Sequence, residues 1–322
     1  MRLKSNRLQL ALSVIILGVF AVYFLANRHQ FDPLLHIKAG YLALIALVYL
    51  AIMAVNSLFT KVVLQRFHKF IGFVESYYVT LIASVGNYFA PVGAGFAFRA
   101  VYLKKKHGLS YGDYISILSG NYILVFLVSS VLGLWSVLML RGQHSPKLAV
   151  ISLFFVAMLV GTLLLGLVRI PHHKIESISN RPLRKILKIL VQIADGWKTI
   201  TASRELLLKL LTLVVGNAVL TFLGVWLIVS CLHLHVAFAG LLVYSVLGAL
   251  SLFISVTPAN LGVKEAVYLF SASVLGLSVS QVLSIALIDR GIQFLVLAVS
   301  WLLIPKNHQA TAVVKPGERL VD

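Results

Sequence analysis

Long apolar runs dominate the pattern of hydrophobic and polar positions along the chain. Each run has close to, or more than, the roughly 20 residues that a helix needs to cross the hydrocarbon of a bilayer. The pattern therefore predicts an all-α integral membrane protein with six full spans. The runs are residues 8–26, 39–60, 114–140, 148–168, 206–231 and 281–304.

Two further apolar regions, 74–98 and 236–277, are interrupted by proline and glycine and contain charged residues. The two interruptions are alike, and this similarity predicts an internal repeat. Three landmarks recur in the same order at offsets of 166 to 168 residues: Pro91 and Pro258, the Ala-Val-Tyr-Leu runs from Ala100 and Ala266, and the Gly-Leu-Ser runs from Gly108 and Gly276.

Composition supports membrane insertion and narrows the function classes. Of the 322 residues, 60% are hydrophobic and only 12% are charged, whereas soluble domains have about 25% charged residues. The net charge of +18 is explained by membrane topology and by contact with anionic lipid, because the basic residues flank apolar spans. We expect no nucleic-acid partner.

Cysteine and histidine give no sign of a metal site or another cofactor. Cys231 is the only cysteine, and the ten histidines have no acidic or thiol ligands at a useful spacing. We therefore expect neither a metal nor a cofactor. No nucleotide-binding or zinc-protease motif is present either.

The positive-inside tendency decides how the interrupted regions lie in the membrane. If 74–98 crossed once, Lys104, Lys105 and Lys106 would be external, whereas a re-entrant hairpin keeps them cytoplasmic. With two re-entrant hairpins, 21 of the 28 Lys and Arg residues are cytoplasmic, four are external and three lie at membrane depth. This ratio favours re-entrant hairpins and places both termini in the cytoplasm.

On this topology the two copies, 72–140 and 236–304, are inverted repeats. Each consists of a broken hairpin followed by one full span, and such inverted repeats recur in transporters. The alternative is a duplication that serves stability alone. It leaves the charged residues at membrane depth unexplained.

Three other segments complete the organisation of the chain. The run 8–26 follows basic residues but precedes no cleavage site, so we interpret it as a retained span. Residues 183–200 have the spacing of a basic amphipathic helix at the cytoplasmic interface, which either links the two halves or has a regulatory or lipid-sensing role. Residues 305–322 form a polar cytoplasmic tail, and residues 1–304 the membrane domain.

The charged residues in the second copy are the strongest candidate site. Asp289 and Arg290 are neighbours on one helix, where side chains point about 100° apart, so each needs a partner elsewhere. The candidates are Lys264, Glu265 and Arg99. Two interpretations remain open: an ion-pair network that clamps the repeats together, and a cavity that binds polar lipid headgroups.

The interruptions themselves are candidate hinges and anion sites. Pro91 and Pro258 remove helix donors, and Gly93, Gly95 and Gly262 permit tight turns. A helix that restarts after such a break presents free N–H groups, which suit a phosphate. Asn87 and Asn260 lie close to the two interruptions. Their side-chain amides either bind a headgroup or satisfy the loosened backbone.

At these elements the sequence resembles the lysylphosphatidylglycerol synthase transmembrane family, also described as a flippase-like domain. The similarity extends over about residues 8 to 304. The residues that match are Asn87 through Arg99-Ala-Val-Tyr-Leu, Pro258 through Glu265-Ala, both Gly-Leu-Ser runs, and Asp289-Arg290.

The resemblance implies a flippase-type membrane module. Larger members of the family carry a soluble domain that transfers an aminoacyl group to phosphatidylglycerol, for which this chain has no room, so synthase activity is not expected. The family often has an acidic-Arg pair in the first repeat, where this chain has Asn121 and Tyr122.

The leading hypothesis is a lipid flippase or transporter of a prokaryotic inner membrane, without enzymatic activity. Its partner would be an anionic phospholipid or a lipid-linked phosphate, attracted by Arg99, Lys264 and Arg290. One alternative is a membrane enzyme of lipid or lipid-linked glycan modification, with Glu265 and Asp289 as acid and base. Another is an accessory subunit, and a homo-oligomer is compatible with the sequence.

Overall fold

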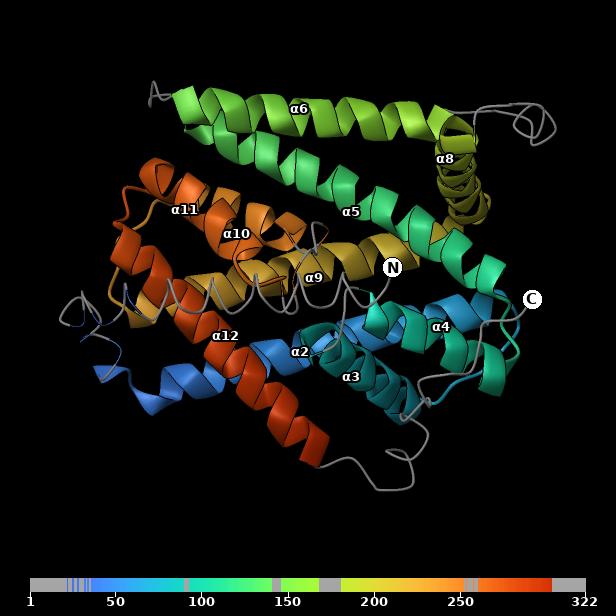
Figure 1. Ribbon diagram of the computed structural model, residues 1–322, viewed down its shortest axis with the longest axis horizontal. Coiled ribbons are helices and arrows are strands. Elements are labelled where there is room, and N and C mark those ends of the chain that lie inside the picture. The colour runs from blue at the N-terminus through green and yellow to red at the C-terminus, as the bar shows by residue number, and fades with distance from the viewer. Residues whose placement is uncertain are drawn as a thin grey trace.

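A computed structural model describes residues 36–89, 93–140, 146–167, 181–251 and 260–302, together with a few isolated positions. Every regular element among these residues is a helix (Figure 1). The predicted span 8–26, the tail 305–322, Pro91 and Pro258 lie outside the described residues. The helices are α2 (Ala39–Arg66), α3 (Phe73–Phe89), α4 (Ala94–His107), α5 (Tyr111–Met139), α6 (Pro146–Leu167), α8 (Arg181–Thr201), α9 (Arg204–Cys231), α10 (Phe238–Ser251), α11 (Val263–Leu275) and α12 (Val279–Leu302).

Five of these helices are long and apolar enough to cross a membrane, namely α2, α5, α6, α9 and α12. They correspond to the five predicted spans that fall within the described residues, and those predictions are confirmed as helices of spanning length. Helices α5, α6, α9 and α12 begin two or three residues before the predicted apolar runs, and α2 continues past the end of its run to Arg66. Ser110 and Ser203 explain two of the helix starts, because each hydroxyl accepts an N–H bond from the first turn of α5 or α9.

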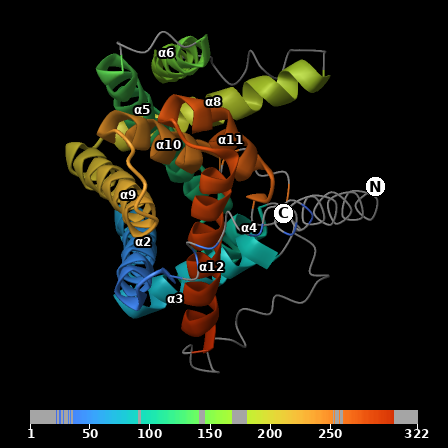
Figure 2. The ribbon, with the colours of Figure 1, turned by 90° about the vertical axis from the view of Figure 1, so that its left-hand side faces the viewer.

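Long helices pack side by side in two pairs, α2 with α9 and α5 with α6 (Figure 1). Helix α12 lies against α2, α3, α9 and α11, and α10 lies against α5, α9 and α11. In the view turned by 90°, α12 stands between the α2–α9 pair and α4 (Figure 2). Of the shorter helices, α10 is the one whose side chains are almost all buried.

The two copies of the repeat have the same order of elements. In each, a first helix, a break, a second short helix and a tight turn precede a long helix: α3, α4 and α5, and then α10, α11 and α12. Glycines in the left-handed region occupy equivalent points, with φ of +82° at Gly93 and +85° at Gly262 before the short helix. Gly108 and Gly276, at φ +62° and +68°, end it.

The copies also pack against each other reciprocally. The first helix of copy one, α3, contacts the long helix of copy two, α12, and α10 of copy two contacts α5 of copy one. Side chains of both copies therefore converge where the two breaks lie.

The predicted amphipathic segment 183–200 is helical and slightly longer, as α8. It crosses the end of α5, where the backbones approach closely at Gly120 and Gly196. A Cβ atom on Gly196 would collide with the carbonyl oxygen of Ser116. Helix α8 is therefore fixed to a spanning helix by a contact that requires glycine.

Candidate functional site

Four charged residues of the second copy form two ion pairs between α11 and α12. Lys264 Nζ lies 2.5 Å from Asp289 Oδ2, and Arg290 Nε donates to Glu265 Oε1. In each ion pair the two residues are 25 positions apart in the sequence, so a single register of α11 against α12 brings both pairs into contact. The side chains are 16% and 7% exposed in the first pair and 16% and 12% in the second.

Tyrosines from three other helices surround this network. The Tyr49 hydroxyl of α2 donates to Asp289, and the Tyr88 hydroxyl of α3 lies 3.4 Å from the Arg290 carbonyl oxygen. Lys264 Nζ lies 5.5 Å from the centre of the Tyr268 ring, which stacks on Tyr244 with the centroids 3.8 Å apart. The network therefore joins α2, α3, α11 and α12 in one polar unit.

The structure supports part of the partner assignment made from the sequence. Lys264 and Glu265 do meet Asp289 and Arg290, as expected. Arg99 contributes to neither of the ion pairs described. Tyr49 was not predicted as a site residue, because a single tyrosine within an apolar span is indistinguishable from core packing.

The polar side chains at the breaks bond to backbone atoms. Asn87 Oδ1 accepts from the Gly95 N–H at 3.0 Å, and Asn260 Nδ2 donates to the Ser251 carbonyl oxygen at 2.7 Å. Glu265 Oε2 accepts from the Gly262 N–H at 2.7 Å. These bonds satisfy backbone groups that a broken helix leaves unpaired. For Asn87 and Asn260 they agree with the second role considered from the sequence, that of satisfying the loosened backbone.

Arg99 lies in the first copy, on α4, and has a different environment. Its guanidinium is next to the side chains of Tyr114 and Tyr122 on α5. Arg99 Nε, the Tyr114 hydroxyl and Asn121 Oδ1 are buried and have no hydrogen-bond partner among the described residues. Such orphaned groups are rare in folded proteins and need an explanation.

A second polar cluster lies at the other end of the first hairpin. Glu75 Oε1 of α3 is 2.8 Å from His107 Nε2 and 3.1 Å from Lys106 Nζ, and it accepts from the Tyr102 hydroxyl at 2.8 Å. Burial raises the pKa of Glu75, but the hydrogen bonds from His107, Tyr102 and Lys106 outweigh burial, and the pKa is lowered overall. This cluster joins the start of α3 to the end of α4.

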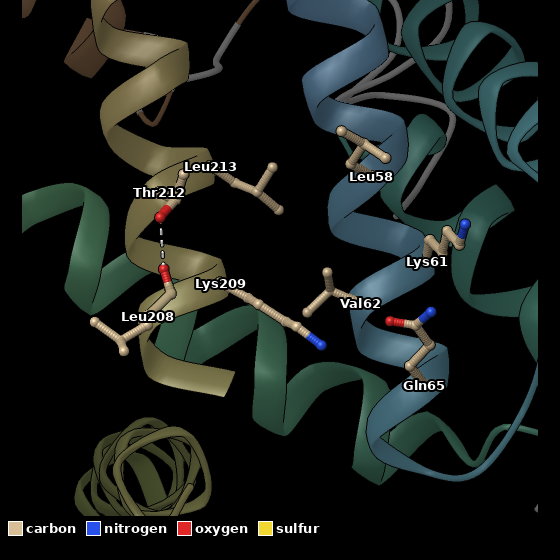
Figure 3. A pocket seen from close by; sticks show the side chains of 8 residues that line it. All are labelled: Leu58, Lys61, Val62, Gln65, Leu208, Lys209, Thr212 and Leu213. Carbon is tan, nitrogen blue, oxygen red and sulfur yellow. Dashed lines mark hydrogen bonds between the residues drawn. The ribbon is translucent and has the colours of Figure 1, made fainter. Parts of the chain in front are cut away.

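A groove of about 470 Å³ runs between α2 and α9, away from the charged network (Figure 3). Val62 and Leu213 face each other across it, and Lys209 extends from α9 towards α2. Lys209 is ion-paired with Glu205 at 2.5 Å, whereas the side chain of Lys61 points away from the groove. No residue proposed from the sequence as a site residue lines it.

The hydrogen bonds within the charged network limit the chemical roles of its two carboxylates. Each carboxylate is bonded to a cation and to one further donor: Tyr49 for Asp289, and the Gly262 N–H for Glu265. The arrangement is suited to holding balanced charge at depth, where an unpaired charge costs about 2.5–3.5 kcal/mol or more.

Five helices of spanning length, shorter helices that begin after glycine-containing breaks, and paired charges between α11 and α12 define a multi-pass helical membrane protein. The chain belongs to the lysylphosphatidylglycerol synthase TM region family, whose model matches residues 8–300. Membership connects the protein with lipid modification or lipid flipping at a membrane. Searches of curated proteins and of solved structures gave no match.

Proposed function

We propose that this protein binds a polar-headgroup lipid between its two repeats and moves the headgroup across the membrane. The observation that supports this most directly is the pair of ion pairs at the second break. Two cations and two anions are retained within a hydrophobic protein at considerable energetic expense, and polar groups at such depth mark pathways for polar substrates.

The proposed topology has two inverted copies with cytoplasmic termini. Two features support it: the equivalent glycines at both breaks and the reciprocal packing of α3 on α12 and α10 on α5. A cysteine at Lys105 should then react with a membrane-impermeant maleimide only from the cytoplasmic side. Labelling from the external side would contradict the re-entrant hairpin and the inverted repeat with it.

Proteoliposomes test the movement of lipid. The purified protein is reconstituted with a fluorescent phospholipid, and a reductant that cannot cross the bilayer is added outside. Empty vesicles lose about half of the fluorescence, and vesicles containing the protein should lose nearly all of it. Loss of only half with the wild-type protein would refute translocation of that lipid.

Two variants separate charge from folding. Arg290→Ala should abolish translocation although the protein still inserts, because the network loses one of its two cations. The double variant Arg290→Ala with Glu265→Ala removes both charges and leaves none unpaired. If the network takes part in transport, the double variant is folded and inactive. Recovery of full activity in the double variant would make the pair a structural clamp, and unchanged activity of Arg290→Ala would refute its role.

The enzyme alternative receives less support from the geometry. A general acid or base must be free to exchange a proton with substrate, whereas both carboxylates are engaged by cations and further donors. Turnover of a labelled lipid donor by the purified protein would favour the enzyme.

A further inference from the structure

The two copies of the repeat carry different charges at equivalent positions. The Ala-Val-Tyr-Leu run follows Arg99 in the first copy and Glu265 in the second, at an offset of 166. At an offset of 168, Tyr122 takes the place of Arg290. The acid and the base that pair in copy two are thus replaced in copy one by a base and a neutral phenol.

This exchange leaves the first copy with an uncompensated cation. Lys264 and Arg290 are each balanced by a carboxylate, but no ion pair with Arg99 exists among the described residues. An unpaired charge in a low-dielectric environment is costly. A ligand that supplied an anion here would relieve that cost.

The neighbours of Arg99 have the hydrogen-bonding groups that such an anion needs. Tyr114 is only 2% exposed, and its hydroxyl lies beside the Arg99 guanidinium without a well-formed hydrogen bond to any described residue. Together with the Arg99 Nε–H it provides two donors on adjacent helices. Charge-assisted bonds from arginine and hydroxyl groups are the usual means of holding phosphate.

Aromatic side chains border this position and include one from the other copy. The Tyr122 ring meets Phe96 edge-on at 6.4 Å and Phe253 at 5.0 Å between centroids. Phe96 and Phe253, beside the first and second breaks, are 44% and 41% exposed. Apolar, exposed rings next to a half-buried cation suit a ligand that is part hydrocarbon and part anion.

We infer that Arg99, with the Tyr114 hydroxyl, forms a phosphate site, and that its ligand is the phosphodiester of an anionic lipid. This inference rests on the proposed function and adds to it the residue that recognises the headgroup. Lys264 and Arg290 then balance the carboxylates, and Arg99, which forms no ion pair within the part of the chain that the structure describes, supplies its charge to the ligand.

Binding is tested with wild-type protein and variants in phosphatidylcholine nanodiscs, with and without phosphatidylglycerol, and with inorganic phosphate. Thermal unfolding reports stabilisation, and native mass spectrometry reports the bound lipid. Phosphatidylglycerol should stabilise the wild-type protein. Arg99→Gln should weaken its binding at least about tenfold, since one charge-assisted contact is lost, and Arg99→Lys should restore part of it.

The stability of the lipid-free protein provides an independent readout. Because Arg99→Gln removes a half-buried charge that forms no ion pair among the described residues, the variant should unfold at the same temperature as wild type or a higher one in phosphatidylcholine alone. The matched control is Lys105→Gln, which removes an exposed charge from the same helix and should leave the response to phosphatidylglycerol unchanged. Equal phosphatidylglycerol affinity in the Arg99 and Lys105 variants would overturn the site.

The remaining outcomes distinguish a lipid from free phosphate as the ligand. They also distinguish failure of the phosphate site from failure of the proposed lipid translocation. Stabilisation by inorganic phosphate but not by phosphatidylglycerol would overturn the lipid as the ligand. Arg99-dependent lipid binding by a wild-type protein that moves no lipid would support the site and refute translocation. Translocation with lipid affinity unchanged in Arg99→Gln would refute the site alone.

Discussion

Lys264 and Asp289 form an ion pair of 2.5 Å between α11 and α12, and both side chains are largely buried. Removing one member of a buried pair leaves a charge without a partner and costs about 3–5 kcal/mol, more than the pair itself contributes. The pair therefore makes the packing of the second hairpin against its long helix dependent on charge.

Asp289→Asn should destabilise the protein strongly, by about 3–5 kcal/mol. The double variant Asp289→Asn with Lys264→Met removes both charges and should be more stable than the single variant. Thermal or denaturant unfolding of the four proteins in one detergent measures the coupling. Additive effects of the two substitutions would show that the pair has no coupling energy.

The backbone conformation at the breaks should require glycine, because φ is positive there. At Gly93, with φ +82°, a Cβ atom would meet no neighbour within 4 Å, so the penalty is one of backbone conformation alone. Gly93→Val should cost about 1–2 kcal/mol, and Gly93→Asn less, because asparagine tolerates this region. Unfolding temperatures measure both.

Gly216 provides the control for that experiment. It lies within α9, where an added Cβ atom also meets nothing within 4 Å, so Gly216→Ala should be neutral or stabilising by about 0.5–1 kcal/mol. Equal effects of Gly93→Val and Gly93→Asn would mean that φ at the break is not constrained.

The first hairpin should lose stability in acid. The pKa of Glu75, which lies outside the five candidate spans, is lowered from its ordinary value of 4.5 because its hydrogen-bond donors outweigh burial. A carboxyl group with a lowered folded-state pKa stabilises fully above its unfolded pKa and loses that contribution as pH falls through the folded value.

Glu75→Gln should therefore lower the unfolding temperature at pH 7, by about 2–4 °C for each kcal/mol lost. It should also reduce the fall in stability below about pH 4.5 relative to wild type. Unfolding scans from pH 7 to pH 3 provide the measurement. An identical pH dependence in both proteins would show that Glu75 does not link α3 to α4.

Helix α8 should separate from α5 when Gly196 is enlarged. Ser116 Oγ and Thr199 Oγ1 lie 3.5 Å apart across the contact, so Ser116→Cys with Thr199→Cys should form a disulfide under mild oxidation. Adding Gly196→Val should reduce cross-linking severalfold, since its side chain would meet the Ser116 carbonyl oxygen. The native Cys231 is buried and should not interfere; cross-linking unaffected by Gly196→Val would contradict the close approach.

Much of the fold could be read from the chain. Apolar runs of spanning length predicted α2, α5, α6, α9 and α12, because a helix must satisfy its own backbone in hydrocarbon. Proline and glycine predicted where the chain is interrupted, and Gly93 and Gly262 there have the left-handed backbone that excludes most other residues. The neighbouring charges at Asp289 and Arg290 also required partners, and composition left few candidates.

The tertiary structure decided which partners meet. That Lys264 bonds Asp289 while Glu265 bonds Arg290 depends on the register of α11 against α12, which no pattern within one helix specifies. The isolation of Arg99 and the burial of Tyr114 depend on how α4 packs against α5. Helix formation follows from local sequence, but the choice between a paired and an unpaired charge follows from contacts between segments far apart in the chain.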